Sequence, residues 1–181
     1  MKNVLPTNMT NVMLEGKPGT GKTTLLKNCA DILSSIRIGG FYTEEIRGRG
    51  TRVGFTIKTM DGHSGVLSHV SFKAGPRVGK YRVDIPAFEK IGVQSLEKAL
   101  TDSDVVFIDE IGKMELFSPL FRKAVLRCLD SIIPVFATVM SGPHPFTDSI
   151  KARADVQLIK VTSENRDEIA RTLLEKINAV K

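Results

Sequence analysis

The chain has 181 residues, of which 41% are hydrophobic and 25% are charged, and its formal net charge is +6. These values predict a single folded domain and exclude a disordered tail, a collagen-like fibre and a disulfide scaffold. No stretch approaches the roughly 18 to 20 consecutive apolar residues of a membrane helix. Residues 1–17 also lack the apolar core of a secretion signal. We therefore expect no membrane contact.

The two cysteines, Cys29 and Cys128, lie in apolar helical patterns. This favours two buried free thiols in a reducing compartment, and hence a cytoplasmic protein, over a disulfide. The positive charge by itself leaves the partner open, because nucleic acid, a membrane surface and an anionic small molecule all attract a basic protein.

Strand and helix patterns alternate toward both ends of the chain. Residues 11–15 are predicted to form a short strand, and a helix follows from residue 22. Its apolar stripe consists of Leu25, Leu26, Cys29, Ile32, Leu33 and Ile36. The apolar run 105–108 is typical of a strand that is buried on both faces.

Ser118 and Pro119 mark the start of a further helix, as a serine cap followed by a first-turn proline. The side chains expected to point inward from this helix are Leu120, Phe121, Ala124, Val125, Cys128 and Leu129. Buried strands are predicted over residues 132–140 and 156–161. A last helix carries Ile169, Leu173, Leu174 and Ile177 on one side. This alternation predicts an α/β fold with a mostly parallel sheet that helices cover on both faces.

The middle of the chain differs, because residues 40–46, 52–59 and 65–72 are short, β-rich and punctuated by glycine turns. We interpret about residues 40–85 as a small antiparallel β-insertion on the α/β core. Residues 47–82 hold eight lysines and arginines and one aspartate, a net charge of +7, whereas the other 145 residues sum to −1. If this basic segment faces a phosphate site, its charge matches a triphosphate. If it faces away, a nucleic-acid partner gains support.

The strongest motif is a phosphate-binding loop, G-x-x-x-x-G-K-S/T, between the first strand and the first helix. Its residues are Gly16, Lys17, Pro18, Gly19, Thr20, Gly21, Lys22 and Thr23. Glycine lets the backbone approach a phosphate closely, and the amides at a helix N-terminus bind an anion. We expect Lys22 to contact the β- and γ-phosphates, Thr23 to ligate Mg²⁺ and Thr24 to donate to the α-phosphate.

Two carboxylates follow the second buried strand. The strand and its continuation comprise Val105, Val106, Phe107, Ile108, Asp109, Glu110, Ile111 and Gly112. Because strand ends gather at the ligand edge of a parallel sheet, we expect Asp109 to hold Mg²⁺ and Glu110 to activate a water against the γ-phosphate. Asp109 to Gly112 also fits the D-x-x-G pattern of GTP switches. None of the six asparagines is followed by lysine, however, so the sequence does not predict strict GTP specificity.

Several segments together resemble the thermophile-type nucleoside-triphosphatase family, which is related to the human cancer-related nucleoside-triphosphatase. They are GKPGTGKTTLL, GGFYTEEIR, GPRVGKYRVDI, DVVFIDEIGKMELFS and VFATV, and the resemblance runs from about Asn11 to the C-terminus. It implies a RecA-like P-loop fold and Mg²⁺-dependent hydrolysis of nucleoside triphosphates with broad base tolerance. It also implies that the nucleotide contacts fall on residues 16–23 and 105–112. The chain departs from the family pattern after VFATV, where Met140 and Ser141 replace a histidine or another polar residue.

Five arginines of the basic segment are candidates for stabilising the transferred phosphoryl group: Arg47, Arg49, Arg52, Arg77 and Arg82. Each by itself is better interpreted as a solvated loop cation. The segments around Arg77 resemble the family, so we choose Arg77 as the catalytic arginine.

Other polar residues have weaker assignments. Glu44 and Glu45 are interpreted as outward-facing strand residues, with a role near the attacking water as the alternative. Arg166 is assigned equally to base stacking and to a solvated first turn of the last helix. His144 stands between two prolines, which favours a rigid loop over a substrate contact. His63 and His69 do not have the spacing of zinc ligands.

Together these features predict a Mg²⁺-dependent, monomeric nucleoside triphosphatase whose partner is a nucleoside triphosphate. Two alternatives remain open. A nucleoside or small-molecule kinase shares the loop and the size, and residues 47–82 would then form an arginine-bearing lid, although Glu110 argues for water as the acceptor. An RNA-linked nucleotide switch has the positive charge as its support. Because no RNA-stacking motif is present, nucleic acid is an open but not a favoured partner.

Overall fold

The computed structural model describes residues 11–32 and 35–178. Two parts of the predictions lie outside this range: Leu33 of the predicted helical stripe, and residues 1–10, where no secretion signal is expected. The described elements are β1 (Asn11–Glu15), α1 (Lys22–Ile32), β2 (Ile38–Gly48), β3 (Thr51–Thr59), β4 (Ser64–His69), β5 (Arg77–Val78), β6 (Tyr81–Val83), α2 (Ile85–Phe88), η1 (Glu89–Val93), α3 (Gln94–Asp102), β7 (Val105–Ile111), η2 (Glu115–Phe117), α4 (Pro119–Leu129), β8 (Val135–Val139), α5 (Pro145–Lys151), β9 (Val156–Lys160) and α6 (Arg166–Asn178).

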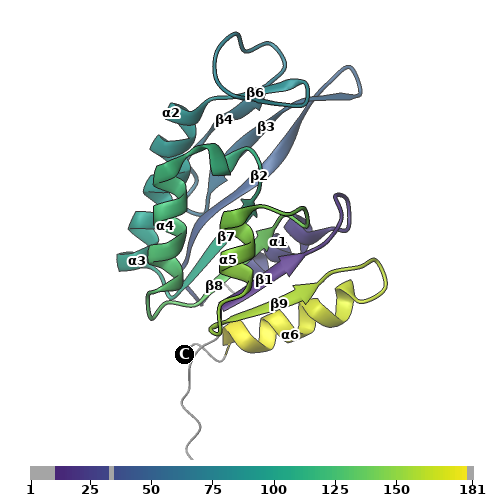
Figure 1. Cartoon of the computed structure of the whole chain (residues 1–181). Helices are drawn as coiled ribbons and strands as arrows, with labels where there is room; N and C mark the ends of the chain where they lie inside the picture. The colour runs from purple at the N-terminus through teal and green to yellow at the C-terminus, as the bar shows by residue number, and fades with distance from the viewer. Residues whose placement is uncertain (1–10, 33–34, 179–181) are drawn as a thin grey trace, which may run out of the picture.

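These strands form one sheet in the order β5-β6-β4-β3-β2-β7-β8-β1-β9 (Figure 1). In the part of the sheet that runs β2-β7-β8-β1-β9, all neighbouring strands are parallel. The phosphate loop follows β1, and Asp109 and Glu110 lie near the C-terminal end of β7, two strands away from β1 in the sheet. Because parallel strands end at the same edge, both motifs meet there.

The β-rich middle of the chain is antiparallel, as predicted, and its strands continue the core sheet. Residues 38–41 of β2 pair in parallel with β7, and residues 41–48 of the same strand pair antiparallel with β3. Strands β4, β6 and β5 extend the antiparallel part. One long strand therefore belongs to both halves, and this continuity fixes the basic segment relative to the phosphate loop.

Helices cover both faces of the sheet, as expected for strands that are buried on both sides. On one face, α1 and α6 pack through Leu26, Cys29 and Leu173. On the other face, α2, α3, α4 and α5 surround a cluster in which the rings of Phe88 and Phe121 lie 5.2 Å apart (Figure 1). Along the described residues, no helix combines the length and the apolarity that a membrane crossing needs.

Three apolar residues that the sequence placed in the core are exposed instead. Ile32, at the C-terminal end of α1, is 64% exposed, and Leu120, in the first turn of α4, is 50% exposed. Ile132 is 93% exposed because the predicted strand over 132–140 starts only at Val135. Pro134 precedes that start and has no N–H for a strand ladder.

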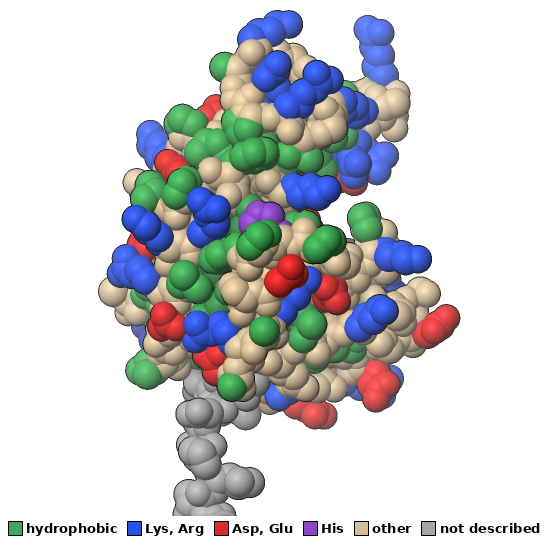
Figure 2. All heavy atoms as spheres, viewed as in Figure 1, with side chains coloured by type: hydrophobic (Ala, Val, Ile, Leu, Met, Phe, Trp, Pro, Cys, Tyr) green, Lys and Arg blue, Asp and Glu red, His purple; other side chains and the backbone are tan. Residues whose placement is uncertain are grey.

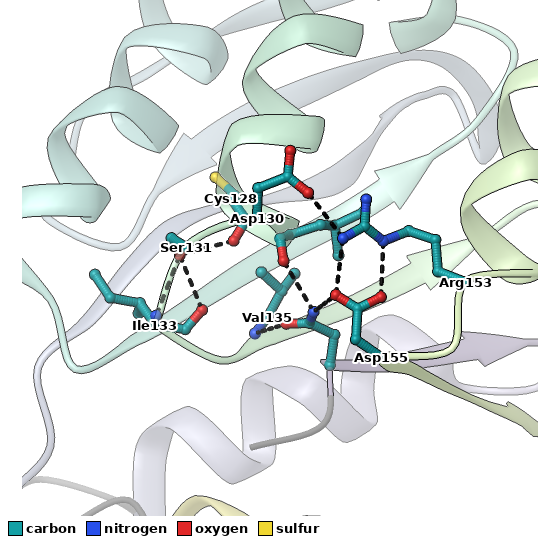
Figure 3. Close-up of polar contacts among 9 residues, drawn as sticks. Cys128, Asp130, Ser131, Ile133, Val135, Arg153 and Asp155 are labelled. Atoms are coloured by element: carbon teal, nitrogen blue, oxygen red, sulfur yellow. Dashed lines mark hydrogen bonds and ion pairs between the residues drawn. The ribbon is translucent and has the colours of Figure 1, made fainter. Parts of the chain in front are cut away.

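The turn before β8 is held by side-chain hydrogen bonds (Figure 3). The hydroxyl of Ser131 donates to the Cys128 carbonyl at 2.7 Å and accepts from the Ile133 amide at 3.1 Å. In the same region, the Asn11 side chain accepts from the Val135 amide at 3.0 Å. These contacts seat the first residue of β1 against the start of β8.

The last strand was also predicted to be buried, and it is not. Strand β9 pairs with β1 and forms the edge of the sheet, so that Leu158 is 42% exposed. An apolar run alone does not distinguish a central strand from an edge strand. The predicted helix after it agrees with α6, which buries Ile169, Leu173 and Ile177, whereas Leu174 is partly buried.

Candidate active site

The phosphate loop takes the conformation for which its glycines are suited. Gly19 and Gly21 have φ angles of 82° and 84°, in the left-handed region that side chains disfavour. Gly16 has a different reason to lack a side chain, because a Cβ there would lie 2.6 Å from the carbonyl oxygen of Val161. Glycine is therefore required at Gly19 and Gly21 by the backbone conformation, and at Gly16 by the close contact with Val161, which follows β9.

Polar contacts within the loop hold its lysine across it. The Lys22 ammonium donates to the carbonyls of Gly16 and Lys17 at 2.8 and 3.0 Å. The Thr20 hydroxyl donates to the same Lys17 carbonyl at 2.9 Å. These bonds place a positive charge above the N-terminus of α1, where the helix dipole also favours an anion.

Asp109 is the centre of a buried polar cluster. Its Oδ1 accepts from the hydroxyls of Thr23 and Thr138 at 2.9 and 2.8 Å, and its Oδ2 accepts from Thr43 at 3.4 Å. The residue is 2% exposed. Burial raises the pKa of Asp109, and the hydrogen bonds from the three threonines oppose that rise. Strands β2, β7 and β8 and helix α1 each contribute one member of the cluster.

Glu110 and Glu115 are two further carboxyl groups beside this cluster. Burial and the charge of Asp109 raise the pKa of Glu110, whereas the positive charge of Lys22 opposes the rise. Glu115, at the start of η2, is 4% exposed, and burial with the charge of Glu110 raises its pKa to about 8. Burial and the repulsion between the two groups therefore oppose the ionisation of both carboxyls, and Glu115 favours its protonated form at neutral pH.

These residues line a cleft of about 800 Å³. One wall comes from the phosphate loop and the ends of β7 and β8, and it includes Lys22, Asp109 and Thr138. The opposite wall comes from the antiparallel half of the sheet. Figure 2 shows lysine and arginine side chains gathered over that end of the molecule, above a hollow in the surface.

Of residues 47–82, all of which the structure describes, four line this cleft. One is a cation, Arg52, and the other three are the apolar residues Phe55, Leu67 and Val78. Arg52 donates to Glu45 at 2.9 Å and to the Tyr81 hydroxyl at 2.9 Å. The segment therefore faces the phosphate loop, but mainly with apolar side chains.

Glu44 and Glu45 also line the cleft, and both are paired. Glu44 contacts Lys27 at 2.5 Å and Lys58 at 2.6 Å, and these hydrogen bonds hold its pKa below the ordinary value. Hydrogen bonds from Arg52 and Arg47 lower the pKa of Glu45 in the same way. Both carboxylates therefore stay ionised and serve as counter-ions for the segment's cations.

The other predicted arginines lie away from the cleft lining. Arg77 is exposed on β5 and donates to the Gly79 carbonyl at 2.8 Å, and Arg82 is its cross-strand neighbour. Arg47 pairs with Glu45 at 2.6 Å. His144 caps α5 by accepting from the Phe146 amide at 3.2 Å, in agreement with a rigid loop. The catalytic role of Arg77 thus remains a prediction, and Arg77 is not among the residues that line the cleft.

A family model described as NTPase matches residues 11–174. The chain belongs to this NTPase family. The nucleoside-triphosphatase THEP1 of Thermotoga sp. (strain RQ2) is 44% identical over 163 residues, which cover 90% of this chain and 92% of that protein. The cancer-related nucleoside-triphosphatase of Homo sapiens is 40% identical over 174 residues, covering 88% and 92% of the two chains.

Solved structures of the NTPase family agree with the fold. The crystal structure of THEP1 from Aquifex aeolicus superposes with a TM-score of 0.85 at 37% identity, over 92% of this chain and 98% of that one. These findings confirm the family resemblance carried by the sequence motifs. They also confirm a P-loop NTPase fold with a mostly parallel core sheet and helices on both faces.

Within this NTPase-family site, sequence reasoning did not single out three residues. Thr43 and Thr138 donate to Asp109, and Glu115 is the buried carboxyl beside Glu110. Each stands in a segment that carried the family resemblance, which is the signal that could have found it. Their roles depend on which strands are neighbours, and a local motif does not contain that information.

The oxygen cluster has the chemistry of a magnesium site. Mg²⁺ is bound in phosphate-transfer sites by one or two protein oxygens together with substrate phosphates and waters. Thr23 and Asp109 offer two such oxygens 2.9 Å apart, at the mouth of the phosphate loop. Among the described residues, no group of three or more His, Cys, Asp or Glu side chains is placed to hold a metal ion by itself. The donors present therefore fit Mg²⁺ that is shared with a bound nucleotide.

Proposed function

We propose that the protein hydrolyses the β–γ phosphoanhydride of nucleoside triphosphates to a nucleoside diphosphate and phosphate. The observation that carries the proposal is the meeting of the phosphate loop with Asp109 and Glu110 in one cleft. The names of the THEP1 and cancer-related relatives support the same reaction class.

The phosphate loop binds the triphosphate in this proposal. Its backbone amides and the dipole of α1 attract the anion, and Lys22 places a positive charge against the β- and γ-phosphates. Lys22 already lies across the loop through its bonds to Gly16 and Lys17. Little reorganisation of this side chain is then needed when the nucleotide binds.

Thr23 and Asp109 would hold Mg²⁺, which when bound neutralises charge on the β- and γ-phosphate oxygens. Asp109 is itself oriented by Thr43 and Thr138. Such outer hydrogen bonds fix the direction of a metal-binding carboxylate. The family relationship supports a nucleotide substrate, and the magnesium assignment rests on the oxygen donors of this chain.

Glu110 accepts the proton of the attacking water. The water oxygen forms a new bond to the γ-phosphorus, the bond from that phosphorus to the bridging oxygen breaks, and the diphosphate leaves with the bond's electron pair. The raised pKa of Glu110 makes its ionised form a stronger base than an ordinary glutamate. Glu115, held protonated beside it, does not compete for the same proton at neutral pH.

Two arginines are candidates for stabilising the charge that develops on the γ-phosphoryl group. Arg77 is the residue predicted from the family-like segment. Arg52 is the arginine that lines the cleft, held against Glu45 and Tyr81. We propose Arg52 for this role, because a guanidinium acts only where it reaches the transferring group.

Phosphate release from ATP, GTP, CTP and UTP, measured with Mg²⁺ and without any acceptor, tests this function. Hydrolysis predicts release of phosphate from all four at rates within about tenfold of each other, since no element of strict guanine recognition is present. A kinase predicts no release until an acceptor hydroxyl is added. Strict dependence on an acceptor would therefore contradict the proposal.

A further inference from the structure

The segment that follows β9 runs along the outer side of the phosphate loop. The amide of Val161 donates to the Glu15 carbonyl at 2.7 Å, which continues the pairing of β9 with β1 past the end of the strand. The Val161 carbonyl then packs on Gly16. The segment after β9 and the segment after β1 therefore stay in contact from the end of β1 into the phosphate loop.

Arg166, at the start of α6, lies over the last glycine of the loop. A Cβ on Gly21 would be 3.1 Å from both Cδ and Nη1 of this arginine. Gly21 directly precedes Lys22, where α1 begins, and it lines the cleft. The Arg166 side chain therefore covers the point where the phosphate loop becomes a helix.

The position of Arg166 is fixed by the turn before it. The Asn165 side chain accepts from the Thr162 amide at 2.8 Å and donates to the Lys160 carbonyl at 2.9 Å. The guanidinium itself is only lightly engaged. Its contact with Asp167 is 3.6 Å, and the Asp167 side chain is 85% exposed. A solvated pair of this kind costs little to break.

The order of the strands tells which part of a nucleotide would approach Arg166. Asp109 and Glu110, which act at the γ-phosphate in the proposed function, lie near the C-terminal end of β7. The sheet then continues through β8 and β1 to β9. A triphosphate lying along the loop with its γ-phosphate beside β7 directs its α-phosphate, and the nucleoside beyond it, toward β9 and α6.

We infer that Arg166 is the platform on which the nucleobase of the substrate stacks. This inference rests on the proposed nucleotide-hydrolysing function and specifies its nucleoside subsite. A guanidinium is planar, weakly hydrated and able to lie flat on a ring. Every base has such a face, so stacking binds purines and pyrimidines without reading their edges. The same contact would let a site without a guanine-reading element accept several bases.

Calorimetric titration of Arg166→Ala with ATP, UTP and inorganic tripolyphosphate, each with Mg²⁺, tests the inference. Tripolyphosphate has the phosphates but no base. We expect the dissociation constant for ATP to rise about tenfold, the constant for UTP to rise less because its ring is smaller, and the constant for tripolyphosphate to stay within about twofold of wild type. Arg166→Lys should not restore ATP binding, because an ammonium group has no plane to stack.

Arg171→Ala is the matched control, since it removes an exposed arginine from the same helix and should leave all three constants unchanged. Equal weakening of ATP and tripolyphosphate by Arg166→Ala would show a phosphate contact and overturn the inference. Unchanged ATP binding would overturn it as well.

If tripolyphosphate binds too weakly to titrate, the ratio of the ATP and UTP dissociation constants decides, because loss of a stacking platform must move that ratio toward one. Failure of the hydrolytic function would instead be seen as absent phosphate release by the wild type.

Discussion

The two halves of the sheet use charge in different ways. In the parallel half, strands β7, β8 and β1 are apolar and buried, and the polar groups that could do chemistry stand at their ends or in the loops after them. In the antiparallel half, cations are spread along β2 to β6, and three of them, Arg47, Arg52 and Lys58, are paired with Glu44 or Glu45.

The comparison shows that the net charge of a segment does not give its charge at the site. Residues 47–82 carry a net charge of +7, yet they present one arginine and three apolar side chains to the cleft. The phosphate loop lies in the nearly neutral remainder of the chain and places its lysine directly at the helix N-terminus. Phosphate recognition is therefore expected to depend on the parallel half, and the antiparallel half is expected to close the cleft.

The largest effect is expected from Lys22→Ala, in the parallel half. Loss of this ammonium should remove measurable nucleotide binding and lower phosphate release to about 1% of wild type or less, because it takes the positive charge away from the mouth of the loop. Lys123→Ala, on the exposed side of α4, removes the same charge as a control. Binding retained by Lys22→Ala would move the anion site away from the loop.

A smaller effect is expected in the antiparallel half, and it should be confined to the arginine of the cleft. Arg52→Ala should lower kcat about tenfold or more with little change in KM, since the guanidinium acts on charge that develops in the transition state. Arg77→Ala should change kcat by less than about threefold. A larger loss of kcat in Arg77→Ala than in Arg52→Ala would mean that the antiparallel half moves far enough on nucleotide binding to bring Arg77 to the γ-phosphate.

The smallest effect concerns stability and Glu115. Its pKa is raised from 4.5 to about 8 in the folded chain, so the unfolded chain releases this proton first, and the free energy of unfolding falls as pH rises through that range. Glu115→Gln removes the titration. Between pH 5 and 8, the melting temperature of wild type should therefore fall more steeply with rising pH than that of the variant.

Equal pH dependence of wild type and Glu115→Gln would show that the buried carboxyl is ionised. Its charge would then need a partner other than the backbone groups that contact it. Differential scanning fluorimetry at a series of pH values makes the comparison without any nucleotide present.

The parts of the site that could be predicted from sequence are those whose geometry is local. The phosphate loop is set by glycines and a helix N-terminus within eight residues, and Asp109 and Glu110 follow directly from the end of an apolar strand. The partners of Asp109 could not be predicted in the same way. Thr43 and Thr138 reach it only because β2 and β8 flank β7.

The features of the fold that the sequence does not show have the same origin. The antiparallel strands predicted for about residues 40–85 form, but the pairing of the first of them with β7 joins residues 67 positions apart in the chain. Likewise, β9 is apolar in sequence and lies at the edge of the sheet. Composition predicts that a strand forms, whereas its exposure depends on how many neighbours it finds.

Replacement of Glu110 by Gln tests the central claim most directly, because it changes a proton acceptor and leaves the loop and Asp109 in place. The account predicts that Glu110→Gln binds ATP with Mg²⁺ about as tightly as wild type but releases phosphate about 100-fold more slowly, or slower still. Turnover within threefold of wild type would contradict the assignment of Glu110 as the base.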